Sequence, residues 1–110
     1  MPDKFNVYIV EDDEWYLKML TYHVELDPDN EVMVFTSGSE MLKNLYKKPN
    51  LITLDYSLGE VNADEIFEKI IDFDPEIPVV IISGQENIST AVEMLKKGAY
   101  DYIVKNEDTK

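Results

Sequence analysis

Five short apolar runs alternate with longer amphipathic stretches along this chain, and this alternation restricts the possible folds more than any other feature. The runs cover residues 6–10, 32–35, 51–54, 78–82 and 100–104. A short apolar strand followed by an amphipathic helix is the repeating unit of a parallel sheet with helices on its faces. We therefore expect a single α/β domain with the order β-α-β-α-β-α-β-α-β and a doubly wound, five-stranded parallel sheet.

The stretches between the runs carry start and stop signals for helices. Asp13 can cap the first helix, and Ser37 opens the second within a capping-box pattern. Asn62 can cap the third helix in the same way, and the fourth begins near Asn87. Gly98 stands at the C′ position of that fourth helix, where glycine commonly ends a helix. These signals support the alternating order of elements.

Polar side chains follow four of the apolar runs at the point where each run ends. The third run ends in Asp55, the fourth is followed by Ser83 and the fifth by Lys105. Carboxyl ends of parallel strands meet at one edge, where open α/β sheets place their ligands, so we expect these groups to converge. The first run is followed by an acidic cluster, which consists of Glu11, Asp12 and Asp13.

Such a set of groups suits a divalent cation held beside a carboxylate that accepts a phosphoryl group. Clustered carboxylates repel one another unless a cation is present, and Mg²⁺ prefers carboxylates with several waters. Lys105 and the Ser83 hydroxyl could then hold phosphoryl oxygens. Each residue alone has an ordinary alternative: Asp55 as a turn residue, Asp13 as a helix cap, Lys105 as a solvated charge. Their occurrence together at strand ends favours the functional interpretation.

Composition excludes several classes of function. The 23 acidic residues against 10 basic ones give a net charge of −13, which repels phosphate backbones and anionic lipid. We therefore expect no direct binding of nucleic acid and no membrane association. The absence of cysteine excludes a disulfide framework and a thiolate metal site. The chain shows neither a signal-peptide layout nor an apolar run of membrane-spanning length, and we expect a cytoplasmic location.

The segments YIVEDD, LITLDYSL, PVVIISG and KKGAYDYIVK resemble the receiver domain of two-component response regulators. The resemblance covers essentially all 110 residues, so that 1–110 is expected to be one receiver domain. It implies a flavodoxin-like fold with strand order 2-1-3-4-5. It also implies that a sensor histidine kinase phosphorylates Asp55 and that the altered domain controls an output domain or partner. The chain would not be an enzyme in the usual sense, but a phosphoacceptor with self-catalysed phosphorylation and autodephosphorylation.

The resemblance also implies a metal site and a phosphate site. Asp12 would be a direct Mg²⁺ ligand together with Asp55, Glu11 would act through water, and Ser57 would contribute its backbone carbonyl. Ser83 and Lys105 would bind the phosphoryl group. Ser83 and Tyr102 would change conformation when Asp55 is phosphorylated.

Three departures from the family pattern stand out. Gly59 occupies a position where the family usually has proline, so a more mobile loop is expected there. Asn106 replaces the proline that usually follows the lysine in a cis peptide, which leaves the isomer of the Lys105–Asn106 bond open. The fifth helix is missing before Lys110, and we expect the chain to be cut from a longer protein. Apolar positions of residues 6–10 and 100–104 would then face water and favour a homodimer.

Three other functions are alternatives to the phosphoacceptor interpretation. A pseudo-receiver could bind partners without phosphorylation, although all the key side chains are present. A phosphohydrolase with an aspartyl intermediate typically needs a second acid two residues after the nucleophile, where this chain has Ser57. A flavin-binding electron carrier of the same topology needs a phosphate-cradling loop after the first strand, where the acidic cluster would repel phosphate. The phosphoacceptor is the interpretation that the residues favour.

Overall fold

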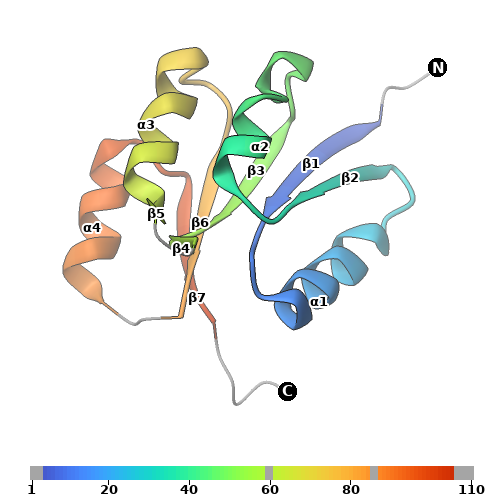
Figure 1. Ribbon diagram of the computed structural model, residues 1–110, viewed down its shortest axis with the longest axis horizontal. Helices are drawn as coiled ribbons and strands as arrows, with labels where there is room; N and C mark the ends of the chain where they lie inside the picture. The colour runs from blue at the N-terminus through green and yellow to red at the C-terminus, as the bar shows by residue number, and fades with distance from the viewer. Residues whose placement is uncertain (1–3, 59–60, 85–86, 106–110) are drawn as a thin grey trace.

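The protein alternates strands and helices as the sequence predicts. A computed structural model describes residues 4–58, 61–84 and 87–105 (Figure 1). The main elements are β1 (Phe5–Val10), α1 (Glu14–Glu25), β2 (Asn30–Phe35), α2 (Gly38–Leu42), β3 (Leu51–Asp55), α3 (Ala63–Phe73), β6 (Val79–Ser83), α4 (Ile88–Lys97) and β7 (Asp101–Val104). Smaller elements are a 3₁₀ turn, η1 (Leu45–Lys47), and a two-stranded hairpin of β4 (Ser57–Leu58) and β5 (Val61–Asn62).

The five long strands form one parallel sheet in the order β2-β1-β3-β6-β7. Numbered along the chain without the hairpin strands, this is the expected order 2-1-3-4-5. Strands β1, β2, β3 and β6 are each followed by a helix before the next long strand of the sheet begins. The predicted α/β class and strand order are therefore confirmed, and all carboxyl ends of the strands lie at one edge.

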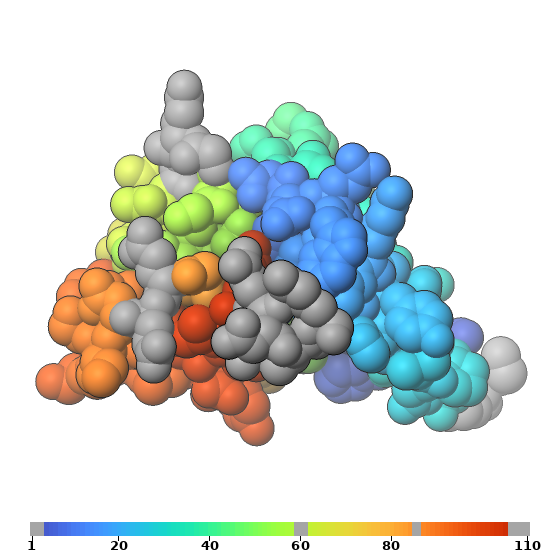
Figure 2. All heavy atoms as spheres, turned by 90° about the horizontal axis from the view of Figure 1, so that it is seen from below, coloured from blue at the N-terminus to red at the C-terminus, as the bar shows by residue number. Residues whose placement is uncertain are grey.

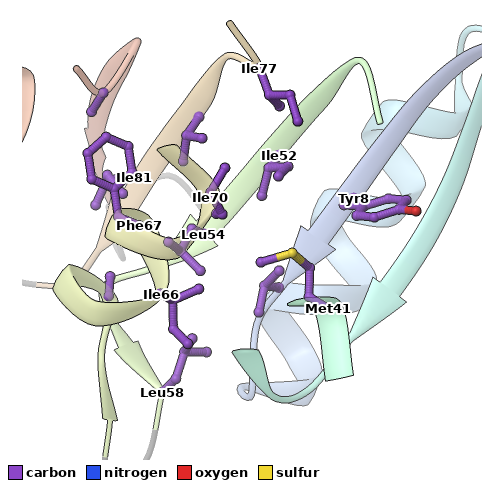
Figure 3. Packing of buried hydrophobic residues seen from close by; sticks show 14 of the residues in the cluster. Tyr8, Met41, Ile52, Leu54, Leu58, Ile66, Phe67, Ile70, Ile77 and Ile81 are labelled. Carbon is purple, nitrogen blue, oxygen red and sulfur yellow. The ribbon is translucent and has the colours of Figure 1, made fainter. Parts of the chain in front are cut away.

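The main core lies between one face of the sheet and helices α2, α3 and α4. Figure 3 shows α3 pointing its apolar side chains at the strands, and the residues that meet there are fully or nearly fully buried. Burial of each such side chain stabilises the fold by about 1.5–3 kcal/mol. Principal members of this cluster are Tyr8, Met41, Ile52, Leu54, Ile66, Phe67, Ile70 and Ile81.

Helix α2 packs closely on α3 through a glycine. A Cβ atom built on Gly38 would lie 2.6 Å from Ile66 Cδ1 and 2.7 Å from Ile66 Cγ1. Both residues are buried, so any larger side chain at this position has to displace a residue of the main core. Gly38 thus sets how closely the two helices approach.

Helix α1 covers the opposite face of the sheet and is held differently. None of its 12 residues is fully buried, whereas α3 buries Ala63, Ile66, Phe67 and Ile70. Its start is well defined, because Asp13 Oδ1 accepts hydrogen bonds from the backbone N–H groups of Trp15 at 3.1 Å and Tyr16 at 3.3 Å. The predicted cap of α1 is confirmed, while its packing is looser than that of the other long helices.

Two of the other predicted caps are also confirmed, and one is wrong. Ser37 and Asn87 accept hydrogen bonds from backbone N–H groups in the first turns of α2 and α4. Asn62 stands at the N-cap position of α3 without a capping hydrogen bond from its side chain. Asn62 is also the last residue of β5, where it pairs with Ser57, and the Ala63 N–H donates to the Tyr56 carbonyl at 3.0 Å, so backbone contacts hold the start of α3. Gly98 ends α4 with φ of 119°, as its C′ position predicts.

The expected exposure of apolar strand residues is correct for β7 and wrong for β1. Residues 7–10 are all buried, because β1 lies inside the sheet between β2 and β3. Strand β7 is an edge strand, and its Ile103 and Val104 are 44% and 37% exposed. Within the described ranges, none of the helices has the length and apolar character needed to cross a membrane.

Candidate functional site

The carboxyl edge of the sheet brings together the polar residues that follow the strands. Figure 2 looks at this edge, where segments from the blue, green, orange and red parts of the chain lie close together. Strand register places them at similar depth: Asp55 pairs with Ile82, and Ser83 pairs with Val104. The hydrogen-bond ladder continues past two strands, because Glu11 N–H donates to Phe35 O at 2.9 Å and Lys105 N–H donates to Ser83 O at 2.7 Å. Backbone pairing therefore fixes the backbone positions from which these side chains extend.

Three carboxylates form a cluster at the centre of this edge. Oxygens of Glu11, Asp12 and Asp55 lie within 4.8 Å of one another. Glu11 and Asp55 are buried, and Asp12 is exposed. Asp13 is committed elsewhere, since its carboxylate caps α1. Within the acidic run, Glu11 and Asp12 thus lie beside Asp55, whereas Asp13 caps α1.

Lys105 lies against this cluster and partly neutralises it. Its Nζ donates to Glu11 Oε2 at 3.0 Å and lies 3.7 Å from Asp55 Oδ1. The same Glu11 oxygen accepts the backbone N–H of Asp13 at 3.1 Å, and Asp55 Oδ1 accepts that of Ser57 at 3.4 Å. One ammonium group therefore serves two buried carboxylates, which leaves an excess of negative charge.

This excess perturbs the protonation of Asp55. Burial, followed by the adjacent Glu11 carboxyl group, raises the pKa of Asp55 to about 8, and Lys105 opposes the shift only in part. Burial lowers the pKa of Lys105, but the two carboxylates outweigh it and the pKa is raised overall. Burial beside Glu11 therefore favours the protonated form of Asp55 relative to an ordinary aspartate.

The donor set fits a hard divalent cation. Among the residues that the structure describes, none forms a hydrogen bond with the buried Glu11 Oε1, and such an oxygen is costly to leave unpaired. Oxygens on opposite sides of a Mg²⁺ ion lie about 4 Å apart, because each bond is about 2.1 Å long. The three carboxylate oxygens all lie within 4.8 Å of one another, so they are near enough to face one ion. Carboxylate oxygens with uncompensated charge are also the ligands that such an ion prefers.

The remaining predicted site residues lie around this cluster. Ser57 begins the short strand β4 and is exposed, and Ser83 is buried at the end of β6. Tyr102 in β7 is half-buried and packs against the main core. Gly59 and Asn106, where the sequence departs from the family pattern, lie outside the described residues.

The structure adds Tyr16, which the sequence analysis did not single out. The centroid of its ring lies 4.6 Å from Lys105 Nζ, so the ammonium group stands over the aromatic ring. Tyr16 is in the first turn of α1, three residues after Asp13. Its position three residues after the acidic cluster is the available signal, but a tyrosine in an amphipathic helix is most often a packing residue.

Comparison with known proteins agrees with the fold. Residues 7–110 match the sequence family described as the response regulator receiver domain. The chain therefore belongs to the family of response regulator receiver domains.

The curated relatives differ in length: some are much longer than this chain, and others are close to it in length. The chain is 31% identical to the transcriptional regulatory protein CssR of Bacillus subtilis over 92% of its own length, but it spans only 44% of CssR. It is 36% identical to a putative NtrX-like response regulator of Rickettsia conorii and spans 22% of that protein. It is 30% identical to the chemotaxis protein CheY of Listeria monocytogenes and spans 83% of it.

Solved structures of receiver domains share the fold. The non-phosphorylated HemR receiver domain of Leptospira biflexa superposes with a TM-score of 0.83 and 27% identity, over 93% of this chain and 82% of that one. A chain of the CheX–CheY–BeF3–Mg²⁺ complex from Borrelia burgdorferi gives a TM-score of 0.83 and 28% identity, over 94% of this chain and 80% of that one.

Proposed function

We propose that this domain is a phosphorylation-controlled switch in which Asp55 accepts a phosphoryl group from a sensor histidine kinase. The observation that carries the proposal is the environment of Asp55. Its buried carboxylate lies 3.7 Å from Lys105 Nζ and shares a cluster with Glu11 and Asp12. A nucleophilic carboxylate, an ammonium group and a cation site together are the requirements for transfer of a phosphoryl group to an aspartate.

Mg²⁺ is the cofactor that the donor set supports. Asp12 and Asp55 would bind it directly, Glu11 through water, and Ser57 through its backbone carbonyl. The ion would offset charge on the phosphoryl oxygens during transfer. The unpartnered Glu11 Oε1 supports this assignment, because a hydrated cation supplies the donor that this oxygen lacks.

The chain's own residues account for the remaining steps. Asp55 has to lose its proton before it can attack, and positive charge near its carboxylate lowers the pKa toward the ordinary range. A carboxylate oxygen then bonds to phosphorus as the bond from phosphorus to the donor's histidine nitrogen breaks. Lys105 and the Ser83 hydroxyl would hold two oxygens of the transferred group. Tyr102 would follow Ser83 in the resulting change of conformation.

The partners proposed for the domain follow from its family and its relatives. CssR is named as a transcriptional regulatory protein and is more than twice the length of the matched segment, so an output domain in the full-length protein is one proposal. The match to CheY of Listeria monocytogenes supports a domain that acts on a separate partner. We also propose a homodimer that forms through the exposed apolar side chains of Ile103 and Val104. A cytoplasmic location is a further proposal.

Intact-mass spectrometry with Mg²⁺ and acetyl phosphate tests the proposal. The wild-type chain should gain the mass of one phosphoryl group, and chelation of Mg²⁺ should prevent the gain. Asp55→Asn should gain nothing, whereas Asp13→Ala, which alters a helix cap, should still be modified. A folded wild-type protein of unchanged mass would overturn the phosphoacceptor and favour a phosphorylation-independent interaction module.

A further inference from the structure

Tyr16 lies where the side chain of Lys105 crosses the edge of the sheet. The half-buried ring approaches Lys105 Nζ to 4.6 Å from its centroid. Its backbone is fixed, because the Tyr16 N–H donates to Asp13 Oδ1 at 3.3 Å. An ammonium group within about 6 Å of an aromatic centroid is attracted by the negative face of the ring.

Among the described residues, two carboxylates and one aromatic ring lie close to Lys105 Nζ, and both carboxylates have other roles in the proposed function. Glu11 Oε2 and Asp55 Oδ1, at 3.0 and 3.7 Å, belong to the carboxylate cluster. A divalent cation in that cluster would repel the ammonium group and compete for the same carboxylates. The aromatic ring is not a ligand for Mg²⁺, so its attraction for Lys105 persists.

We infer that Tyr16 is a positioning residue that keeps Lys105 at the phosphoryl site once a cation occupies the carboxylates. The inference rests on the proposed function. The Tyr16 ring limits the directions that the flexible lysine can take, so Nζ stays where it can meet a phosphoryl oxygen. The contact requires the aromatic ring and not the phenol hydroxyl.

A purely structural role explains the position of Tyr16 less well. The residue is not a member of the main core cluster, and α1 contains no fully buried side chain. Its aromatic neighbour Trp15 lies 6.5 Å away between centroids and is itself 63% exposed. The ring therefore has a defined contact with Lys105 without contributing to the main core.

A first experiment tests the contact independently of phosphorylation. In Mg²⁺-saturated protein, NMR should show the ε-methylene protons of Lys105 shifted upfield by the ring current of Tyr16. Tyr16→Leu should remove the shift and Tyr16→Phe should retain it. A shift that is absent in the wild type, or equal in the leucine variant, would overturn the inference.

A second experiment measures the rate of phosphorylation by acetyl phosphate at saturating Mg²⁺. Tyr16→Leu should slow the reaction by about three- to thirty-fold, the range that loss of one cation–π contact allows. Tyr16→Phe should stay within about two-fold, and the Mg²⁺ dissociation constant should not change in either variant. Tyr22→Leu is the matched control, because Tyr22 is on the same helix and is 64% exposed.

A double-mutant cycle distinguishes positioning from general loosening of α1. In a Lys105→Gln background, Tyr16→Leu should have no further effect on the rate, since the residue acts through Lys105. An equal slowing in both backgrounds, or a phenylalanine variant as slow as the leucine variant, would reject the inference. If the wild-type chain accepts no phosphoryl group, the proposed function is rejected. The kinetic part of this inference is then rejected as well. The NMR comparison still decides whether Tyr16 fixes Lys105.

Discussion

Lys105 Nζ lies 3.0 Å from Glu11 Oε2 and so links two strands that are not neighbours. Strands β7 and β1 are separated in the sheet by β6 and β3. The Lys105 and Glu11 side chains are 18% and 1% exposed, so solvent screens the pair weakly. This ammonium group therefore offsets part of the negative charge of the carboxylate cluster.

Replacement of Lys105 should strengthen Mg²⁺ binding. In Lys105→Met the ion no longer competes with an ammonium group for Glu11, and its affinity should rise by roughly five-fold or more. Isothermal titration calorimetry measures the change. Lys18→Met is the control, because Lys18 forms an exposed pair with Glu14 on α1 and should leave the affinity unaltered. Weaker Mg²⁺ binding in Lys105→Met would contradict the competition.

The two adjacent aspartates should respond differently to substitution. Asp12→Ala should weaken Mg²⁺ binding far more than Asp13→Ala, because Asp12 is in the carboxylate cluster and Asp13 is not. Asp13→Ala should instead lower the free energy of unfolding by about 1 kcal/mol through loss of the α1 cap. Fluorescence of Trp15 during Mg²⁺ titration and urea denaturation provide the two measurements. Equal losses of metal affinity would show that the ligand assignment is misplaced by one residue.

Stability without metal should fall as the pH rises, because of Asp55. Its pKa is raised to about 8 in the folded state, so the folded protein binds more protons than the unfolded chain in this range. The stability linked to Asp55 is fully present below about pH 4 and is lost as the pH rises toward 8, with a slope of at most ~1.4 kcal/mol per pH unit.

The measurement is the difference in unfolding free energy between wild type and Asp55→Asn at several pH values with a chelator present. Titrating groups far from Asp55 are common to both proteins and cancel. The difference should decrease from pH 5 to pH 8, and saturating Mg²⁺ should flatten it, since the bound ion favours the ionised carboxylate. A constant difference without metal would mean that Asp55 is already ionised.

Gly38→Ala should destabilise the protein by about 1–2 kcal/mol, despite the higher helix propensity of alanine. The new Cβ would lie 2.6 Å from Ile66 Cδ1 and force that buried side chain to move. The double variant Gly38→Ala with Ile66→Val, which lacks the Cδ1 atom, should recover part of the loss. Gly84→Ala is the control, since a Cβ there has no neighbour within 4 Å. Thermal unfolding that is unchanged in Gly38→Ala would show that α2 and α3 separate readily.

The arrangement of the strands and the convergence of the site could be predicted from the sequence for one physical reason. Apolar runs mark strands, and a polar residue directly after a run has to lie at the carboxyl edge of a parallel sheet. Asp55, Ser83 and Lys105 each come after such a run, and the structure places all three at that edge. This reasoning needs no knowledge of how individual side chains are oriented.

Features that depend on side-chain orientation or on neighbouring backbone could not be predicted in the same way. The contact of Tyr16 with Lys105 joins residues far apart in the chain, and nothing in the local pattern specifies it. Asn62 is the last residue of β5 and its side chain makes no capping bond to α3, which the local sequence pattern does not reveal. The burial of residues 7–10 depends on the interior position of β1 in the sheet.

The lack of fully buried residues in α1 has a consequence for hydrogen exchange. Amides in a helix with few buried contacts exchange through local opening, at a lower free energy than global unfolding. Amides of α3, which buries four residues, should exchange only when the main core opens. Because Asp12 and Asp13 directly precede α1, a cation bound at the carboxylate cluster would couple its own occupancy to the exchange protection of that helix. The carboxylate cluster and the least protected long helix would then form one cooperative unit.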